Sequence, residues 1–464
     1  MTDISRQDWA GPSRNLVALG VIIGRLVRLE KLPPLPVLIF MVAMPVWAAA
    51  QLFFNSEILM IGPLTYGDLL FPFSLITAAL YPGFRKELVA TAHSMRLYIG
   101  VVFAFCVLGF ASLWVNAFIY SVEFSSIFEV WRPLFYVALL ITLAVYCRAG
   151  YFTPIMVSYL LGLLGGTALN FVQTFMSGGI VSADGVMEYF NPNVTGNMID
   201  VGMFLCVIWL AVQPTNFSII AVATGAIAVF FSYSKGAWLM AFLALGAFFM
   251  VYVSSGKRLS RGMKIARNAM LGLGAIAATA LVVTHMDFIT STIEFKLKQS
   301  VSDRFTQGQS TVALRRGQVL SSLEIMTHDP ILGVGVKNWE VNNDRNRYWL
   351  HDIFLKNDNP HNGFFYILSC MGIPAFFLFI YIVLLPVYLY LLFLPTKLYA
   401  RLAFAAAFLL FLVLSGNVMV HIIANYFLWI FTGFAVFLAR RSMDDAAGRE
   451  HPVIFRTRTA GRLA

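Results

Sequence analysis

The chain has 464 residues, of which 59% are apolar and 12% are charged, and its formal net charge is +10. Soluble globular chains are closer to half apolar and about a quarter charged. Far more residues lie in long apolar runs than one soluble core could bury, so the composition excludes a soluble enzyme. We therefore predict an all-α polytopic membrane protein. The net charge does not indicate a nucleic-acid partner, because the cations cluster between apolar runs, as topology determinants do.

The N-terminal segment, residues 1–34, is predicted to lie in the cytoplasm. Residues 1–15 are polar and lack the charged start, short apolar core and cleavage site of a signal peptide. Residues 16–30 are apolar but short, and they carry Arg25 and Arg28. Such a segment is typical of an amphipathic helix in the membrane interface.

Apolar runs long enough to cross a bilayer recur from residue 35 onward. A helix needs about 20 apolar residues for this, and on that measure we predict about twelve spans. They lie at 35–54, 64–82, 97–119, 132–148, 152–172, 196–212, 217–233, 236–254, 266–284, 373–394, 398–416 and 419–438. Spans one to nine therefore occupy residues 35–284, and spans ten to twelve occupy residues 373–438.

Loop charge orients this array. Basic residues concentrate after spans two, eight and ten and in the tail, at Arg85, Lys86, Arg96, 257–267, Lys397, Arg401 and 439–464. In the loops at 55–63 and 174–195, the only charged residues are acidic: Glu57 in the first, and Asp184 and Glu188 in the second. By the positive-inside rule, both ends of the chain and the basic tail at 439–464 are predicted to be cytoplasmic.

One large segment is predicted to lie outside the membrane on the opposite side. Residues 285–360 hold nine Lys or Arg and nine Asp or Glu, and long translocated segments escape the positive-inside bias. We assign 285–372, between spans nine and ten, as an extracytoplasmic catalytic loop. A short amphipathic helix is predicted at 291–300.

A second helix in this loop is predicted from Thr311 to about His328, ended by Asp329-Pro330 and followed by a glycine-hinged turn at 331–335. Arg315 and Arg316 lie near its N-terminal end, where backbone N–H groups also attract anions. Two guanidinium groups in that position suit a diphosphate, although arginines of a loop are also commonly just solvated.

Two further residues are candidates for the site. His361 stands where the polar loop rejoins the apolar chain, in Asn359-Pro360-His361-Asn362-Gly363. Its imidazole suits chemistry at the membrane surface, or it simply lies at the interface or caps the following helix. Lys235 lies on a very short outer turn, against the topology bias, and an anionic ligand or an ordinary snorkelling side chain would explain it.

No metal or other cofactor is predicted. His285, His328 and His351 are scattered without metal-ligand spacing. The four cysteines lie within or beside apolar runs and include no CxxC pair, so neither a zinc site nor a disulfide framework is indicated. The glycines at 333 and 335 do not form a phosphate-binding loop.

Taken together, these motifs resemble the O-antigen ligase and O-antigen polymerase superfamily of bacterial envelope glycosyltransferases. The similar segments are Pro360-His361-Asn362-Gly363-Phe364-Phe365 with Gly372-Ile373-Pro374-Ala375, Arg315 with Pro330 and Leu332-Gly333-Val334-Gly335, Ser234-Lys235-Gly236, and Asn191-Pro192-Asn193. The resemblance covers about 190–380. It implies a His-Asn pair that opens a short helix, then a Gly-Ile-Pro break into the next span.

The sequence departs from the family pattern at two positions. Lys235 stands where the family has arginine, which keeps the charge but loses the bidentate fork. Val319 stands where the family has an aromatic residue, often tryptophan. Position 319 therefore supplies no aromatic side chain in this chain.

The resemblance implies transfer of a glycan from a polyprenyl-diphosphate carrier to an acceptor sugar hydroxyl, at the outer face of the bacterial cytoplasmic membrane. In that scheme His361 is the base, Arg315 binds the diphosphate with help from Arg316 or Lys235, and Asn362 contacts substrate. The acceptor is a growing glycan in a polymerase, which we favour slightly, or lipid A-core in a ligase. A flippase and a chain-length regulator are the further partners that the family implies.

The competing interpretation from another class is a transporter, such as a flippase for lipid-linked oligosaccharides. A transporter should show charged or broken helices at mid-membrane depth and two related halves. The chain shows no convincing repeat, and its charge collects outside the spans. We therefore expect an enzyme.

Overall fold

A computed structural model describes residues 33–52, 60–61, 64–119, 124–176, 192–213, 218–219, 221–222, 225–226, 229, 235–255, 311–339, 362–418 and 426–448. The predicted interfacial helix at 16–30, the ninth span at 266–284 and the short helix at 291–300 lie outside these residues.

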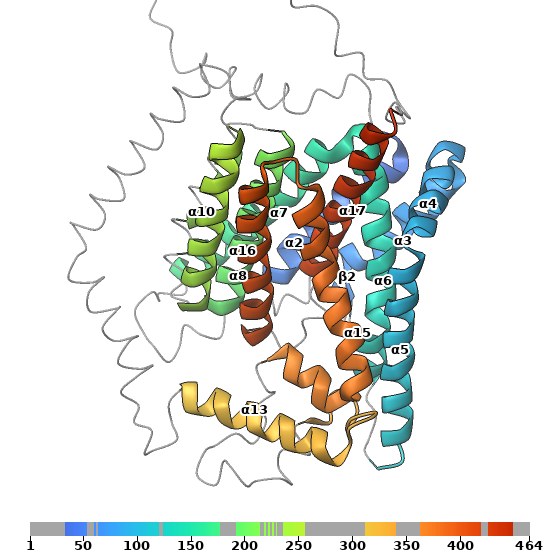
Figure 1. Cartoon of the computed structure of the whole chain (residues 1–464), viewed down its shortest axis with the longest axis vertical. Coiled ribbons are helices and arrows are strands. Elements are labelled where there is room, and N and C mark those ends of the chain that lie inside the picture. The colour runs from blue at the N-terminus through green and yellow to red at the C-terminus, as the bar shows by residue number, and fades with distance from the viewer. Residues whose placement is uncertain are drawn as a thin grey trace, which may run out of the picture.

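The described chain is almost entirely helical (Figure 1). Its elements are α2 (Leu35–Leu52), α3 (Tyr66–Leu80), α4 (Pro82–Ser94), α5 (Arg96–Asn116), α6 (Phe124–Tyr146), the π-helical η2 (Cys147–Tyr151), α7 (Phe152–Met176), α8 (Pro192–Val212), α10 (Lys235–Ser255), α13 (Thr311–His328), α15 (Gly363–Phe393), α16 (Leu398–Val418) and α17 (Tyr426–Ala446). Two strands of two residues each, β1 (Met60–Ile61) and β2 (Leu64–Thr65), pair antiparallel.

Five helical runs among the described residues are long and apolar enough to cross a membrane. They are Arg96–Asn116, Ser126–Gly166, Gly236–Ser254, Gly363–Phe393 and Leu398–Ser415. Three shorter apolar helices coincide with the predicted spans at 35–54, 64–82 and 196–212. These helices support the predicted all-α polytopic class, whereas the number of twelve spans stays a prediction.

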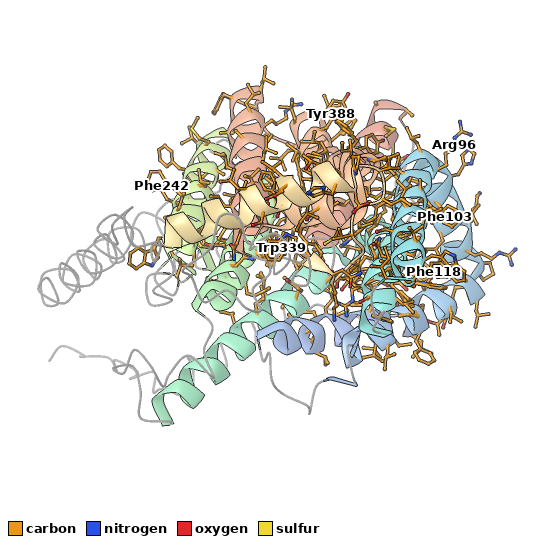
Figure 2. All side chains as sticks on the ribbon, turned by 90° about the horizontal axis from the view of Figure 1, so that it is seen from below. Arg96, Phe103, Phe118, Phe242, Trp339 and Tyr388 are labelled. Atoms are coloured by element: carbon orange, nitrogen blue, oxygen red, sulfur yellow. The ribbon has the colours of Figure 1, made fainter. Side chains whose placement is uncertain are left out.

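The outer surface of the bundle is apolar, as lipid contact requires. Phe103 on α5, Phe118 just after α5, Phe242 on α10 and Tyr388 on α15 project outward (Figure 2), with exposed fractions between 56 and 81%. A soluble protein rarely exposes contiguous apolar patches of this kind. The side chains therefore fit a protein whose sides face hydrocarbon.

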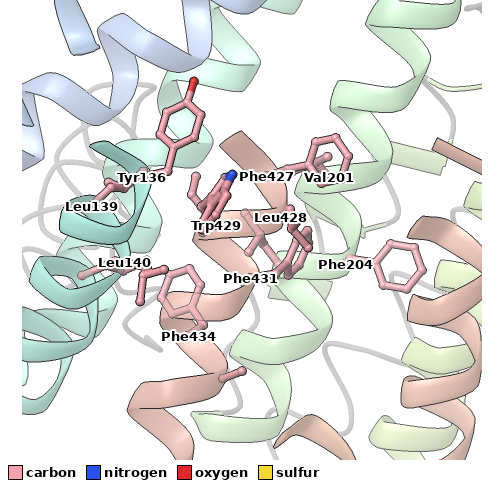
Figure 3. Close-up of a cluster of buried hydrophobic side chains, with 14 of the residues drawn as sticks. Tyr136, Leu139, Leu140, Val201, Phe204, Phe427, Leu428, Trp429, Phe431 and Phe434 are labelled. Atoms are coloured by element: carbon pink, nitrogen blue, oxygen red, sulfur yellow. The ribbon is translucent and has the colours of Figure 1, made fainter. Parts of the chain in front are cut away.

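Helix α17 forms the centre of the bundle. Every residue from 427 to 439 is buried, so this helix has no lipid-facing side. Figure 3 shows its aromatic side chains between α6 and α8. Trp429 packs against Tyr136 of α6 with ring centroids 5.9 Å apart, and Phe431 packs against Phe408 of α16 at 4.7 Å.

Helix α4 replaces part of the loop that the sequence predicted after span two. Pro82 stands in its first turn, where a missing N–H costs nothing, and Phe84, Leu88 and Thr91 form one buried face. The remaining faces carry exposed Arg85 and Lys86. The basic loop is therefore an amphipathic helix at the end of the bundle.

A buried ion cluster joins α4 to the ends of two other segments. Arg148 of η2 pairs with Glu87 of α4 and Asp444 of α17, and Arg440 donates a hydrogen bond to Thr91. A charge buried this deeply is stable only when paired. This pairing explains why α17 continues to Ala446, past residue 438, where the last span was predicted to end and the tail to begin.

Helix α13 lies across the opposite end of the bundle, where α5 ends and α6 begins (Figure 1). The basic α4 and the ion cluster mark one end, and α13 marks the other. If the basic end is cytoplasmic, as the positive-inside rule predicts, α13 is extracytoplasmic.

Candidate functional site

The helix predicted in the polar loop is present with the predicted bounds, as α13 from Thr311 to His328. The turn that follows it contains Gly333 with φ 64° and Gly335 with φ 93°. These left-handed conformations favour glycine, because it has no Cβ. The glycine-hinged turn is thus confirmed.

The break predicted in α15 is also present, and its backbone explains where the turn goes. Gly372 has φ 81° and ψ 177°, so the helical path is interrupted there. Pro374 has no N–H, and a continuous helix would therefore leave the Cys370 carbonyl without a donor. The break also frees the Ser369 carbonyl from the N–H of Ile373.

The turn after α13 docks into this break. The Val334 N–H donates to the Ser369 carbonyl at 3.0 Å, and the Gly335 N–H donates to the Cys370 carbonyl at 2.9 Å. In return, the Ile373 N–H donates to the Pro330 carbonyl at 2.8 Å. The turn therefore provides a hydrogen-bond partner for each of the three backbone groups at the break: the Ser369 carbonyl, the Cys370 carbonyl and the Ile373 N–H.

The two backbones approach so closely that only glycine fits at the contact. A Cβ on Gly372 would lie 2.2 Å from the Ile331 carbonyl oxygen, and a Cβ on Gly333 would lie 2.4 Å from the Cys370 carbonyl carbon. Both neighbours are backbone atoms, so a rotamer change cannot relieve the clash. Gly333 and Gly372, which belong to two separate motifs of the sequence, are therefore both required by one backbone contact.

Helix α5 holds this contact from the other side, through residues that the sequence analysis missed. The Ser112 hydroxyl donates to the Cys370 carbonyl at 2.8 Å, and the Asn116 amide donates to the Gly333 carbonyl at 3.0 Å. Both side chains are buried. Two polar residues four apart near the end of an apolar span were the available signal, since that spacing puts them on one helix face.

The segment after the turn ties α13 to α15. The Lys337 N–H donates to the Tyr366 hydroxyl of α15 at 2.9 Å, and the Trp339 indole donates to the Ser322 hydroxyl of α13 at 2.9 Å. Trp339 is fully buried and lies beside α13 in Figure 2. Position 319 of α13 holds valine where the family has an aromatic residue. In this chain an indole nevertheless packs on α13, and it comes from Trp339 after the turn.

These bonds set the direction of both helices. Tyr366 lies six residues before the break at Gly372, and Ser322 lies six residues before the end of α13 at His328. The N-terminal part of α15 and α13 therefore run back from the docked turn in the same direction (Figure 1). At about 1.5 Å per residue, the backbone of Arg316 lies roughly 18 Å from the end of α13 at His328. On the same measure, the backbone of Asn362 lies roughly 15 Å from the break at Gly372.

Asn362 is the N-cap of α15. Its side-chain oxygen accepts hydrogen bonds from the N–H groups of Phe364 at 3.0 Å and Phe365 at 3.2 Å. A cap of this kind stabilises a helix by about 1 kcal/mol. The observed role of Asn362 is therefore structural, and a contact from its amide nitrogen to substrate stays a prediction.

The other predicted site residues belong to the elements just described. Arg315 and Arg316 lie in the second turn of α13, and Lys235 is the first residue of α10, but their side chains lie outside the described part. His361 directly precedes the N-cap residue Asn362 and also lies outside the described part. The structure thus packs α13, the helix of the arginines, against α15, the helix that Asn362 caps, whereas Lys235 belongs to a separate helix.

Metal ligands do not gather anywhere in the described part of the chain. Among those residues there is no group of three or more His, Cys, Asp or Glu side chains that could hold an ion. Cys106, Cys147, Cys206 and Cys370 are all buried as free thiols.

The region that contains this site is similar to a known protein family. Residues 220–380 match a protein-family model described as O-antigen ligase. The match includes Lys235, α13, the docked turn and the break in α15, and it confirms the similarity to the O-antigen ligase and polymerase superfamily. No individual curated protein matches the chain.

Gly372→Ala should detach the turn from α15. A residue with Cβ at this positive φ costs about 1–3 kcal/mol, and overpacking against the Ile331 carbonyl costs a similar amount. We expect a lower melting temperature in detergent and loss of the activity proposed below. The control is Gly246→Ala on α10, where a Cβ meets nothing within 4 Å. Equal melting temperatures for the two variants would contradict the docking.

Substitution of Asn362 separates capping from substrate contact. Asn362→Ala should lose about 1 kcal/mol of stability, whereas Asn362→Ser should retain most of it because serine also caps. If the amide nitrogen contacts substrate, both variants lose transfer activity. Full activity of the serine variant, together with reduced stability of the alanine variant, would leave capping as the sole role of Asn362. Thermal melts and transfer rates measure the two effects.

Proposed function

We propose that this chain, with its O-antigen ligase region, is an integral-membrane glycosyltransferase that uses a polyprenyl-diphosphate-linked glycan as donor. The acceptor is a sugar hydroxyl at the outer face of the cytoplasmic membrane. The reaction needs no nucleotide, because the lipid diphosphate is already a good leaving group.

The match over 220–380 carries the proposal, and the docked turn supports the assignment of roles. The turn fixes α13 against the first part of α15, so the backbone of Arg316 and that of Asn362, the residue after His361, lie at similar distances from the turn along their helices. A diphosphate and an attacking hydroxyl must also lie within a few ångströms of one another. Two helices that run together from one anchor suit this requirement.

The proposed reaction is a single displacement at the anomeric carbon of the donor. The acceptor hydroxyl oxygen forms the new glycosidic bond while the bond from carbon to the diphosphate oxygen breaks. The electron pair leaves with the lipid diphosphate, and His361 takes the proton of the hydroxyl. Histidine suits this task because its imidazole exchanges a proton near neutral pH. The displacement inverts the anomeric centre.

The cations stabilise the charge that develops on the leaving group. Arg315, with Arg316 or Lys235 assisting, binds the diphosphate near the N-terminus of α13. That end of a helix presents unpaired N–H groups and positive dipole charge. Donors held in place before the reaction stabilise the transition state without reorganising.

The topology follows from the same proposal. Twelve spans with both ends in the cytoplasm put residues 285–372 outside the bilayer, where lipid-linked glycans are presented after translocation. A flippase must supply the donor in that case, and a chain-length regulator is a further partner if the product is a polymer. The acceptor is a growing glycan in a polymerase and lipid A-core in a ligase.

The test is transfer in proteoliposomes that contain a polyprenyl-diphosphate oligosaccharide, first alone and then with lipid A-core. A ladder of longer lipid-linked glycans from donor alone identifies a polymerase, and product only with lipid A-core identifies a ligase. We expect His361→Ala to abolish either product, and Arg315→Ala to require a much higher donor concentration.

Two comparisons keep this test specific. Arg85→Ala, on the exposed face of α4 at the other end of the bundle, should transfer glycan like the wild type. Near wild-type transfer by the His361 variant would remove it as the base. Movement of donor across the bilayer without any covalent product would replace the enzyme with a transporter.

A further inference from the structure

A cavity of about 760 Å³ lies at the end of the bundle opposite α13. The C-terminal ends of α8, α10 and α15, the start of α16 and the last turns of α17 surround it. These ends meet on the side where α15 connects to α16 (Figure 1). The cavity is therefore far from the candidate active site, and the transfer chemistry proposed above does not use it.

Three cations line this cavity against a single carboxylate. They are Lys397, Arg401 and Arg441, and the carboxylate belongs to Asp445. With all four groups charged, the lining carries an excess of positive charge. A cavity of this sign attracts an anion.

Part of this charge serves the fold. Cations are favourable near helix C-termini, where carbonyl groups lack helical donors. Arg401 meets this need, because its Nη1 donates to the Leu392 carbonyl at 2.7 Å and its Nε donates to the Thr396 carbonyl at 3.1 Å. Capping of the α15 end therefore accounts for Arg401.

Lys397 and Arg441 have no such role. The Lys397 ammonium lies 5.8 Å from the centroid of the Tyr399 ring, a weak contact at an exposed position. Among the described residues, no hydrogen-bond or ion-pair partner is found for the Arg441 guanidinium, although it lines the same cavity. Two cations, one directly before α16 and one on α17, thus line one cavity in which Asp445 is the single carboxylate among the described lining residues.

The rest of the lining combines the apolar side chains of Val212, Leu392, Phe393 and Leu438, among others, with the polar residues Ser254, Thr396 and Ser442. A free phosphate gains nothing from the apolar part of this lining, whereas the glycerol and upper acyl chain of a lipid do. Basic pockets between membrane helices are known binding sites for anionic headgroups. We propose that this cavity binds the phosphate headgroup of an anionic phospholipid, with Lys397 and Arg441 as the recognising cations.

Native mass spectrometry of the full-length protein in detergent tests this proposal with phosphatidylglycerol and phosphatidylcholine as probes. We expect phosphatidylglycerol to bind at least about tenfold more tightly. The double variant Lys397→Gln/Arg441→Gln should weaken its binding roughly 10- to 30-fold, because each cation near a membrane surface contributes about 1 kcal/mol. Unchanged thermal melting would show that the variant is folded.

The matched control is Arg85→Gln/Lys86→Gln, which removes two cations from exposed positions on α4 outside the cavity. It should change phosphatidylglycerol binding by less than about twofold. An equal loss of phosphatidylglycerol binding in both double variants would show that overall surface charge causes the effect, and it would overturn the proposal. Displacement of the lipid by millimolar inorganic phosphate alone would show a phosphate site instead and would also overturn it.

Discussion

The three hydrogen bonds between the turn after α13 and the broken helix α15 are the contact on which the candidate site depends. Pro374 deprives the Cys370 carbonyl of its helical donor, and a carbonyl left without a partner in an apolar surrounding costs about 1–3 kcal/mol. The turn supplies the missing donors from Val334 and Gly335. A local defect in one membrane helix is thus repaired by a segment more than thirty residues earlier in the chain.

This repair also positions the chemistry. Because the turn is bonded to α15, α13 cannot drift along the face of the bundle, and Trp339 fixes it further through Ser322. The first part of α15, capped by Asn362, extends from the same anchor. Ser112 and Asn116 connect the anchor to α5, which is long and apolar enough to cross a membrane. Arg315, Arg316 and Asn362 therefore belong to elements that are bonded to the helical bundle, although they come from a polar loop of the sequence.

Much of this arrangement was predictable from local sequence, and the rest was not. Most of the apolar runs became helices near their predicted bounds, and α13 was located by its apolar positions and by Asp329-Pro330. The spacing of Ser112 and Asn116 indicated a shared polar helix face, but their bonding partners were not predictable, because these lie more than 200 residues away. Helix α4 was missed because its pattern is short and basic. The central position of α17 depends on packing, which its apolar composition alone does not reveal.

Amide hydrogen exchange of the wild-type protein tests the docked turn most directly. The N–H groups of Val334 and Gly335 are bonded to helix carbonyls at buried positions, so they can exchange only when the turn leaves the break. We predict that a peptide covering 331–336 exchanges as slowly as the buried part of α15, over minutes to hours. Complete exchange of this peptide within seconds, while α15 remains protected, would contradict the account.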